Sequence, residues 1–256
     1  NTPMPSNAQF DSTATLSKNT ESQSALSLEH VYSATPSIPA CGTWPDEIQR
    51  ILNGLTAKLI TENHRSGDLV YKFEEKSILK ISENKEQLMR EKAVNDFLLG
   101  KLPVPRSIAF ADESDEAYYL RSCISGTPLV NYLNDPGKLA KLLAEAMRMV
   151  HSVDISGCRI FNQESSPSSM IPEKTASHPC FVHGDFCLPN ILTDGEHITG
   201  FIDTEAGGIG DPWVDYAWCI WSFEYNLQTT AYTHMLLSEL GISFDQQKFD
   251  TYTKCD

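Results

Sequence analysis

The spacing of apolar residues divides the chain into a strand-rich part and a later helix-rich part. Short apolar runs predict strands, and the charged triplet 74–76 between two of them predicts an antiparallel pair. Apolar residues at steps of three and four predict helices over 87–99 and 139–153. The strands are expected at 69–73, 77–81, 107–110 and 117–124. The pattern therefore predicts an α+β fold, with a small antiparallel sheet followed by a mainly helical half.

In residues 1–43 the apolar residues show neither the short runs typical of strands nor the steps of three and four typical of helices. They are rich in Ser, Thr, Asn, Pro and Ala and contain few large apolar residues. Such a segment cannot bury enough apolar surface to offset the entropy of ordering it. We expect a disordered extension there, and we expect the folded part to begin near Trp44.

The dipeptide Asp194-Gly195 predicts a hairpin in the second half of the chain. Both positions of a two-residue hairpin turn favour positive φ, which Asp and Gly adopt readily. We therefore expect Thr193 to pair with Glu196, and Asn190 with Thr199. The returning strand would then end beside the residues that precede the hairpin.

Three polar side chains would meet at the open end of this hairpin: Asp185, Asn190 and Asp203. Taken one by one, each is equally compatible with a structural role. Together they are the inventory of a phosphoryl-transfer site, in which one carboxylate accepts the proton of an attacking hydroxyl. The amide and the second carboxylate then hold Mg²⁺ against the phosphates of a nucleotide.

Composition narrows the choice of partners. The 256 residues carry a formal net charge of −14, which argues against nucleic acid or an anionic membrane as a partner and favours a polycationic substrate. No apolar run is long enough to cross a bilayer, and no basic region followed by an apolar one begins the chain. We expect a cytoplasmic protein.

Seven cysteines, an odd number without a Cys-x-x-Cys pair, suggest neither a disulfide framework nor a zinc ribbon. The cluster His178, Cys180, His183 and Cys187 raises the question of zinc. Both of its cysteines stand in apolar runs, where cysteine acts as a small buried hydrophobic residue. We expect no zinc site.

The segments His183–Asn190, Gly200–Asp203 and Gly208–Asp211 resemble the signature of the aminoglycoside phosphotransferases, and Phe-Cys-Leu-Pro-Asn resembles their 3'-phosphotransferase branch. The resemblance implies a bilobal, protein-kinase-like fold with ATP and Mg²⁺ as cofactors. It also implies that Asp185 is the catalytic base and that Asn190 and Asp203 are metal ligands.

The resemblance also implies a nucleotide site in the first lobe. Lys80, inside an apolar strand, points either to solvent or to a buried anion; the resemblance favours contact with nucleotide phosphates and a helix glutamate as partner. Glu91 is the expected partner and Glu86 the alternative. The expected nucleotide contacts are Ser66, in the loop before the strand at 69–73, and backbone groups of Ser122 and Ile124 at the adenine edge.

On this basis we expect an extension at 1–43, a nucleotide-binding lobe at 44–124 and a catalytic, substrate-binding lobe at 125–256. The expected activity is transfer of the ATP γ-phosphate to an aminoglycoside hydroxyl, giving antibiotic resistance, with Asp256 contacting the substrate. Between 159 and 182 the chain carries a short Ser- and Pro-rich stretch where the family has a helical insert. That departure leaves two alternatives open: a kinase of another small alcohol, or a non-catalytic nucleotide-binding relative.

Overall fold

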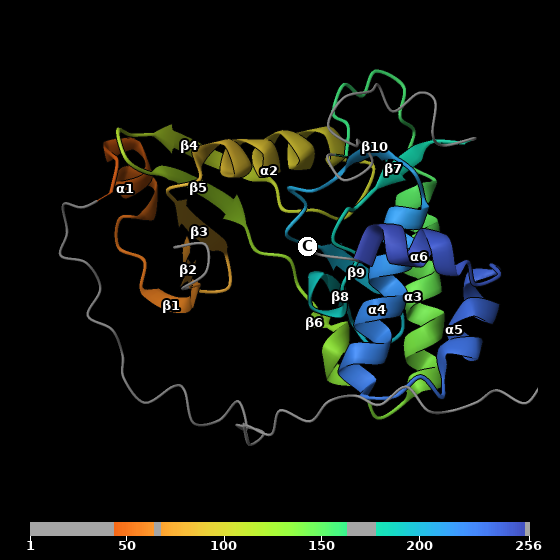
Figure 1. Ribbon diagram of the computed structural model, residues 1–256. Helices are drawn as coiled ribbons and strands as arrows, with labels where there is room; N and C mark the ends of the chain where they lie inside the picture. Colours follow the sequence, from red (N-terminus) through yellow and green to blue (C-terminus); the bar gives the residue numbers. More distant parts are fainter. Residues whose placement is uncertain (1–43, 64–67, 163–177, 254–256) are drawn as a thin grey trace, which may run out of the picture. The chain divides into compact units, whose positions relative to one another are not determined.

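A five-stranded antiparallel sheet forms the N-terminal part of the computed structural model in Figure 1. The structure describes residues 44–63, 68–162 and 178–253. The strand order is β1-β2-β3-β5-β4, with all neighbours antiparallel. The strands are β1 (Ala57–Asn63), β2 (Asp68–Phe73), β3 (Ser77–Ser82), β4 (Ser107–Asp112) and β5 (Ala117–Ser122). The predicted strands and the charged turn between β2 and β3 are therefore present.

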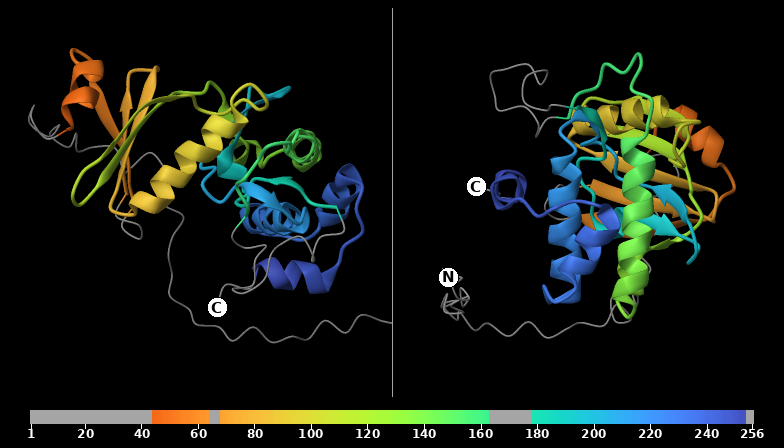
Figure 2. Two further views of the ribbon diagram at one scale, coloured as in Figure 1. Left: turned by 90° about the horizontal axis from the view of Figure 1, so that it is seen from above. Right: turned by 90° about the vertical axis from the view of Figure 1, so that its right-hand side faces the viewer.

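Two helices cover opposite faces of this sheet. The helix α1 (Asp46–Leu52) packs through Ile48 and Leu52 on one face, together with Leu79 and Leu120. The longer α2 (Lys85–Leu98) covers the other face, where Leu88 packs with Ala117 and Tyr119 of β5. In Figure 2, α2 lies between the sheet and the helical half of the chain. Alternation along each strand thus decides which side chains face α2.

The C-terminal part is built around α3 (Pro136–His151), which has a sequence-encoded start. Asp135 accepts a hydrogen bond from the Lys138 N–H, and Pro136 occupies the first turn, where its missing N–H costs nothing. The helix α5 (Thr233–Leu240) packs against α3, α6 (Gln246–Thr253) packs against α4 (Trp213–Leu227), and α4 also contacts α5. One buried apolar cluster unites α3, α4 and α5 with the β8–β9 hairpin.

Short strands connect the two parts and carry the polar motifs. Three of them form a small sheet in the order β6-β8-β9, and two more form the antiparallel pair β7–β10. Their bounds are β6 (Thr127–Pro128), β7 (Cys180–Val182), β8 (Ile191–Thr193), β9 (Ile198–Phe201) and β10 (Gly208–Gly210). The 3-10 turns η1 (Leu129–Tyr132) and η3 (Leu188–Asn190) precede α3 and β8. The α+β fold expected from the sequence is confirmed.

The predicted register of the β8–β9 hairpin is wrong. Thr193 pairs with Ile198, and Ile191 pairs with Phe201, so the turn has four residues instead of two. The Thr193 hydroxyl donates to the His197 carbonyl, and the Asp194 side chain accepts from two N–H groups within the turn. These side-chain bonds stabilise the wider turn, which the Asp-Gly rule does not anticipate.

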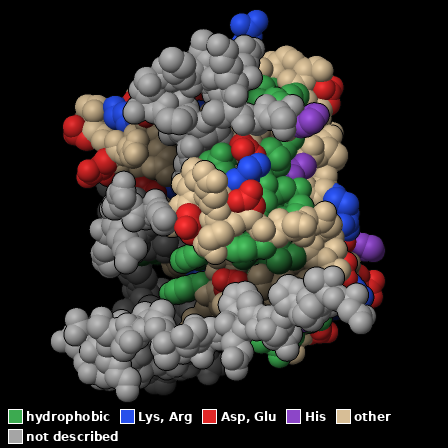
Figure 3. Space-filling view, turned by 45° about the vertical axis from the view of Figure 1, so that its right-hand side comes forward, with side chains coloured by type: hydrophobic (Ala, Val, Ile, Leu, Met, Phe, Trp, Pro, Cys, Tyr) green, Lys and Arg blue, Asp and Glu red, His purple; other side chains and the backbone are tan. Residues whose placement is uncertain are grey.

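Several large apolar side chains remain exposed. Figure 3 shows apolar side chains gathered on one face, with acidic and basic side chains beside them. Those exposed by about 40% or more are Ile51, Met89, Leu99, Phe161, Trp221, Tyr225, Tyr232 and Phe244. In the described ranges no helix is both long and apolar enough to cross a bilayer.

Candidate active site

Lys80 and Glu91 form a buried ion pair on the face of the sheet that α2 covers. Leu79 and Ile81 pack on the α1 side, so the side chain of Lys80 lies on the α2 side. Its Nζ lies 3.1 Å from Glu91 Oε2, and Glu91 is fully buried. Burial alone would lower the pKa of Lys80, but nearby carboxylates, Glu91 foremost, outweigh it and raise that pKa. Lys80 is thus held charged, whereas the alternative partner Glu86 lines another cavity.

A second buried cation, Arg121, joins this pair, and the sequence analysis missed it. Ala117 and Tyr119 of β5 face α2, and Arg121 continues that row. Its Nη1 lies 3.0 Å from Glu91 Oε1, and its Nη2 lies 3.4 Å from Asp203 Oδ1. Each oxygen of Glu91 therefore has its own cation. The alternation along β5 could have indicated this, but only with the pairing of β5 and β3 known.

A cavity of about 430 Å³ opens in front of these charges. Its lining includes Lys80, Arg121, Asp203, Ser122 and Ile124. The N–H groups of Ser122 and Cys123 already donate to carbonyls of neighbouring segments. Among the described residues, the N–H of Ile124 donates no hydrogen bond to a backbone carbonyl. A ligand in this cavity can therefore accept a hydrogen bond from the N–H of Ile124, in the same cavity that Lys80 and Arg121 line.

Asp185 lies in the loop between β7 and β8, where Asn190 fixes its carboxylate. The Asn190 Nδ2 donates to Asp185 Oδ2 at 2.8 Å and to the Asp185 carbonyl at 3.1 Å. Because the amide nitrogen is used in this way, the Oδ1 atom of Asn190 stays available as an acceptor. The short turn η3 places Asn190 directly before β8.

The backbone of this loop is held by a buried carboxylate from α4. Asp215 accepts from the N–H groups of His183 and Gly184, both at 2.9 Å, and His151 Nε2 lies 3.1 Å from it. Gly184 has φ 85°, and a Cβ there would come within 2.5 Å of the Ala206 carbonyl oxygen. Only glycine fits that position without displacing backbone.

Asp203 follows β9 with a left-handed backbone, φ 54°. The Ile202 N–H donates to the Asn190 carbonyl at 3.0 Å, and the His183 ring nitrogen Nε2 lies 3.1 Å from the Ile202 carbonyl. The end of the hairpin is thereby held against its start. Despite the altered register, Asp185, Asn190 and Asp203 lie on neighbouring loops at one end of the hairpin.

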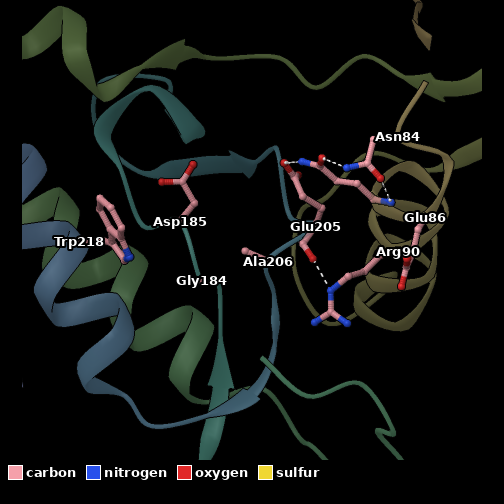
Figure 4. Close-up of a pocket in the computed structure, with 9 residues that line it drawn as sticks. Asn84, Glu86, Arg90, Gly184, Asp185, Glu205, Ala206 and Trp218 are labelled. Atoms are coloured by element: carbon pink, nitrogen blue, oxygen red, sulfur yellow. Dashed lines mark hydrogen bonds between the residues drawn. The ribbon is translucent and has the colours of Figure 1, made fainter. Parts of the chain in front are cut away.

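A second cavity, of about 540 Å³, contains Asp185. Figure 4 shows Trp218 of α4 beside Asp185, with Glu86 and Arg90 of α2 on the opposite side. Asp203 lines the first cavity and Asp185 the second, so the hairpin end lies between the two spaces. Such an arrangement can hold a donor on one side and an acceptor on the other.

Arg90 links α2 to the loop that follows Asp203. Its guanidinium donates to the carbonyls of Glu205 at 2.6 Å, Gly207 at 2.9 Å and Phe161 at 2.5 Å. Burial raises the pKa of Glu205, and the charge of Lys80 opposes that rise. The loop after the hairpin is therefore attached to the same helix that carries Glu91.

Metal-ligating side chains group once within the described ranges, at Glu91, Asp203 and Glu205. Glu91 already pairs with two cations, so we regard this group as a charge network. The four His and Cys residues considered for zinc form no such group in the part of the chain that the structure describes. Burial raises the pKa of Cys180 to about 12, which opposes the thiolate form that zinc requires. Ser66 and Asp256 lie outside the described residues.

Comparison with known proteins agrees with the motifs. A sequence model of the phosphotransferase enzyme family matches residues 165–241 of this chain. An aminoglycoside 3'-phosphotransferase from Niallia circulans is 28% identical over 253 residues, which covers 83% of this chain and 96% of the relative. The chain is thus similar to the APH phosphotransferases, both in the motif-bearing segment and along most of its length.

Solved structures of the APH phosphotransferase family share this fold. An aminoglycoside 3'-phosphotransferase of type VIII superimposes with a TM-score of 0.65 at 18% identity, covering 81% of this chain and 96% of that one. An aminoglycoside phosphotransferase from Streptomyces rimosus, solved with ADP and streptomycin, gives 0.64 at 18% identity, with 80% and 93% covered. The kinase-like architecture expected from the sequence is therefore confirmed.

Proposed function

We propose that this protein is an aminoglycoside phosphotransferase, which transfers the γ-phosphate of ATP to a hydroxyl group of an aminoglycoside and thereby confers antibiotic resistance. One observation carries the proposal: Asp185 and Asp203 stand at one hairpin end between two cavities, and only the cavity with Asp203 also holds the buried Lys80. Two comparisons support the proposal. The similar Streptomyces rimosus structure contains ADP and streptomycin, and the similar Niallia circulans protein is named an aminoglycoside 3'-phosphotransferase.

The first lobe, residues 44–124, would bind the nucleotide in the cavity of about 430 Å³. In our proposal Lys80 neutralises phosphate charge, and Glu91 keeps the ammonium group in place. The backbone of Ser122 and Ile124 would take the adenine edge, with the N–H of Ile124 as donor. Each of these groups lines the cavity or holds a residue that does, which is why we choose ATP as the donor substrate.

The side chains at the hairpin end fit Mg²⁺. The ion prefers oxygen ligands, and Asn190 Oδ1 and the Asp203 carboxylate supply them. The Asn190 amide nitrogen is engaged by Asp185, so the carbonyl oxygen is the atom left for a cation. In phosphoryl transfer the ion neutralises the charge that develops on the transferred group. We propose these two residues as its ligands.

Asp185 would act on the acceptor hydroxyl. Its carboxylate lines the second cavity, and one oxygen accepts from Asn190, so the other can accept the hydroxyl proton. The hydroxyl oxygen then forms a bond to the γ-phosphorus as the bond to ADP breaks. Catalysis would rest on positioning and electrostatics, because phosphoryl transfer asks for little covalent work from the protein. Residues 125–256 would form this acceptor-binding lobe.

The decisive experiment measures Mg²⁺-dependent ADP release from purified protein with ATP, with and without a kanamycin- or neomycin-type aminoglycoside. We expect stimulation by the antibiotic, and loss of at least about 100-fold in rate for Asp185→Ala with ATP affinity retained. Asp115→Ala, in an exposed loop, is the matched control and should stay active. A folded, ATP-binding protein that no aminoglycoside stimulates would overturn the proposal.

A further inference from the structure

Three aromatic side chains form a continuous row along α4. Trp218, Trp221 and Tyr225 recur at steps of three and four, which places them on one face of the helix. The rings of Trp218 and Trp221 meet edge to face at 5.6 Å, and those of Trp221 and Tyr225 stack at 4.9 Å with 10° between their planes. We call these three side chains the aromatic row.

Trp221 and Tyr225 of the row are exposed and Trp218 is half-buried, whereas the opposite face of α4 is buried. Trp221 is 38% and Tyr225 is 60% exposed, whereas Val214, Ile220 and Phe223 of the same helix are fully buried. The exposed pair is also held rigidly, because each ring restricts the rotamers of the other. Large aromatic surfaces kept in water and fixed in orientation are typical of binding sites.

One end of the row enters the cavity that contains Asp185. Trp218 lines that cavity, and Figure 4 shows its indole beside the Asp185 carboxylate. The exposed rings of Trp221 and Tyr225 continue from it along α4. A molecule with one hydroxyl group at Asp185 and further rings beyond it would therefore extend over the row.

We propose that the aromatic row is a binding platform for the ammonium-bearing sugar rings of the acceptor. The inference rests on the proposed function and names the surface that would select its substrate. Aromatic faces attract ammonium groups, and they also pack against the C–H groups of a sugar ring. The chain's net charge of −14 draws a polycationic molecule toward the protein. Rigid, flat, apolar faces beside a carboxylate match an amino sugar better than a neutral, flexible alcohol.

Steady-state kinetics test the platform directly. We expect Trp221→Ala and Tyr225→Ala each to raise the KM for the aminoglycoside by about 5- to 10-fold, with the KM for ATP unchanged. Trp221→Phe and Tyr225→Phe keep an aromatic face and should stay within about 2-fold of the parent KM. Tyr225→Lys should raise the KM further, since it places a cation against a cationic substrate.

Controls separate binding from folding. Phe244→Ala removes another exposed aromatic side chain, 43% exposed, and should leave both KM values unchanged. Thermal unfolding of every variant identifies losses that come from packing. If Trp221→Ala and Tyr225→Ala lower the melting temperature but leave the KM for the aminoglycoside unchanged, the row is a packing surface and the inference is wrong.

A binding measurement distinguishes failure of this inference from failure of the proposed function. Kanamycin added without nucleotide should quench the tryptophan fluorescence of the parent protein, and the response should be lost in Trp221→Ala. Quenching without turnover would sustain the platform and overturn the proposed reaction. Turnover with the parent KM in both alanine variants would sustain the reaction and overturn the platform.

Discussion

Glu91 occupies an unusual position for a single carboxylate. It is fully buried and contacts Lys80 with one oxygen and Arg121 with the other. Arg121 reaches on to Asp203, so one buried cation connects the helix glutamate to the proposed metal ligand. Because Glu91, Lys80 and Arg121 are buried, their charges are stable there only if they stay paired.

The first prediction concerns the second cation of this cluster. Arg121→Met leaves one oxygen of Glu91 without its partner, so we expect the free energy of unfolding to fall by about 2–4 kcal/mol. Urea denaturation measures the loss. Arg121→Lys should recover part of it by restoring the charge, though not the two-armed contact.

Arg106→Met provides the comparison for that measurement. Arg106 is exposed, so its replacement should change the free energy of unfolding by less than about 0.5 kcal/mol. Equal losses for Arg106→Met and Arg121→Met would mean that the ion pairs of Arg121 with Glu91 and Asp203 contribute nothing.

At the scale of elements, the β8–β9 hairpin shows how a turn is selected by its side chains. The Thr193 hydroxyl donates to the His197 carbonyl at 2.6 Å and accepts from the Gly195 N–H at 3.0 Å. Thr193 is fully buried, so neither bond can be replaced by water. A few residues further on, the Thr199 hydroxyl oxygen is buried and has no hydrogen-bond partner in the described part of the chain.

These two threonines give a matched pair of substitutions. Thr193→Val keeps the shape of the side chain and removes two hydrogen bonds, so we expect a loss of about 1–3 kcal/mol in the free energy of unfolding. Thr199→Val removes a hydroxyl that bonds to nothing and should be neutral or slightly stabilising. Denaturant unfolding of both variants side by side decides the matter. A greater loss for Thr199→Val would contradict our account of the turn.

The hairpin also marks the limit of what the sequence could predict. Its existence followed from Asp194-Gly195, because that dipeptide is a local signal. Its register did not, because the side-chain bonds of Thr193 and Asp194 outcompeted the two-residue turn. The ion pair of Lys80 with Glu91 was expected from a family resemblance, whereas Arg121 required knowledge of which strand pairs with which.

At the scale of the whole described fold, α2 connects the five-stranded sheet to the loop that follows Asp203. Leu88 and Glu91 face the sheet, while Arg90 and Gln87 reach the loop after Asp203. Apolar spacing predicted this helix, and the segments Gly200–Asp203 and Gly208–Asp211, on either side of the loop, were recognised as motifs. Nothing local to either segment indicates that they meet, because their contact joins residues more than a hundred positions apart. The two cavities depend on the same long-range packing, so they could not be predicted from the sequence.

The last prediction tests whether this connection positions the proposed catalytic groups. Arg90→Ala removes the donors to two carbonyls of the loop that follows Asp203, those of Glu205 and Gly207, and to the Phe161 carbonyl, so this loop should open more often. We expect amide hydrogen exchange at 204–210 to rise by at least about 10-fold, and kcat to fall by about 10- to 100-fold. ATP affinity should change little, because Arg90 does not line the cavity of Lys80.

Lys92→Ala is the control for this prediction. It breaks only an exposed ion pair with Asp96 and should leave the exchange rate and kcat unchanged. Faster exchange with an unchanged kcat would show that the loop's attachment to α2 stabilises the fold without positioning Asp203.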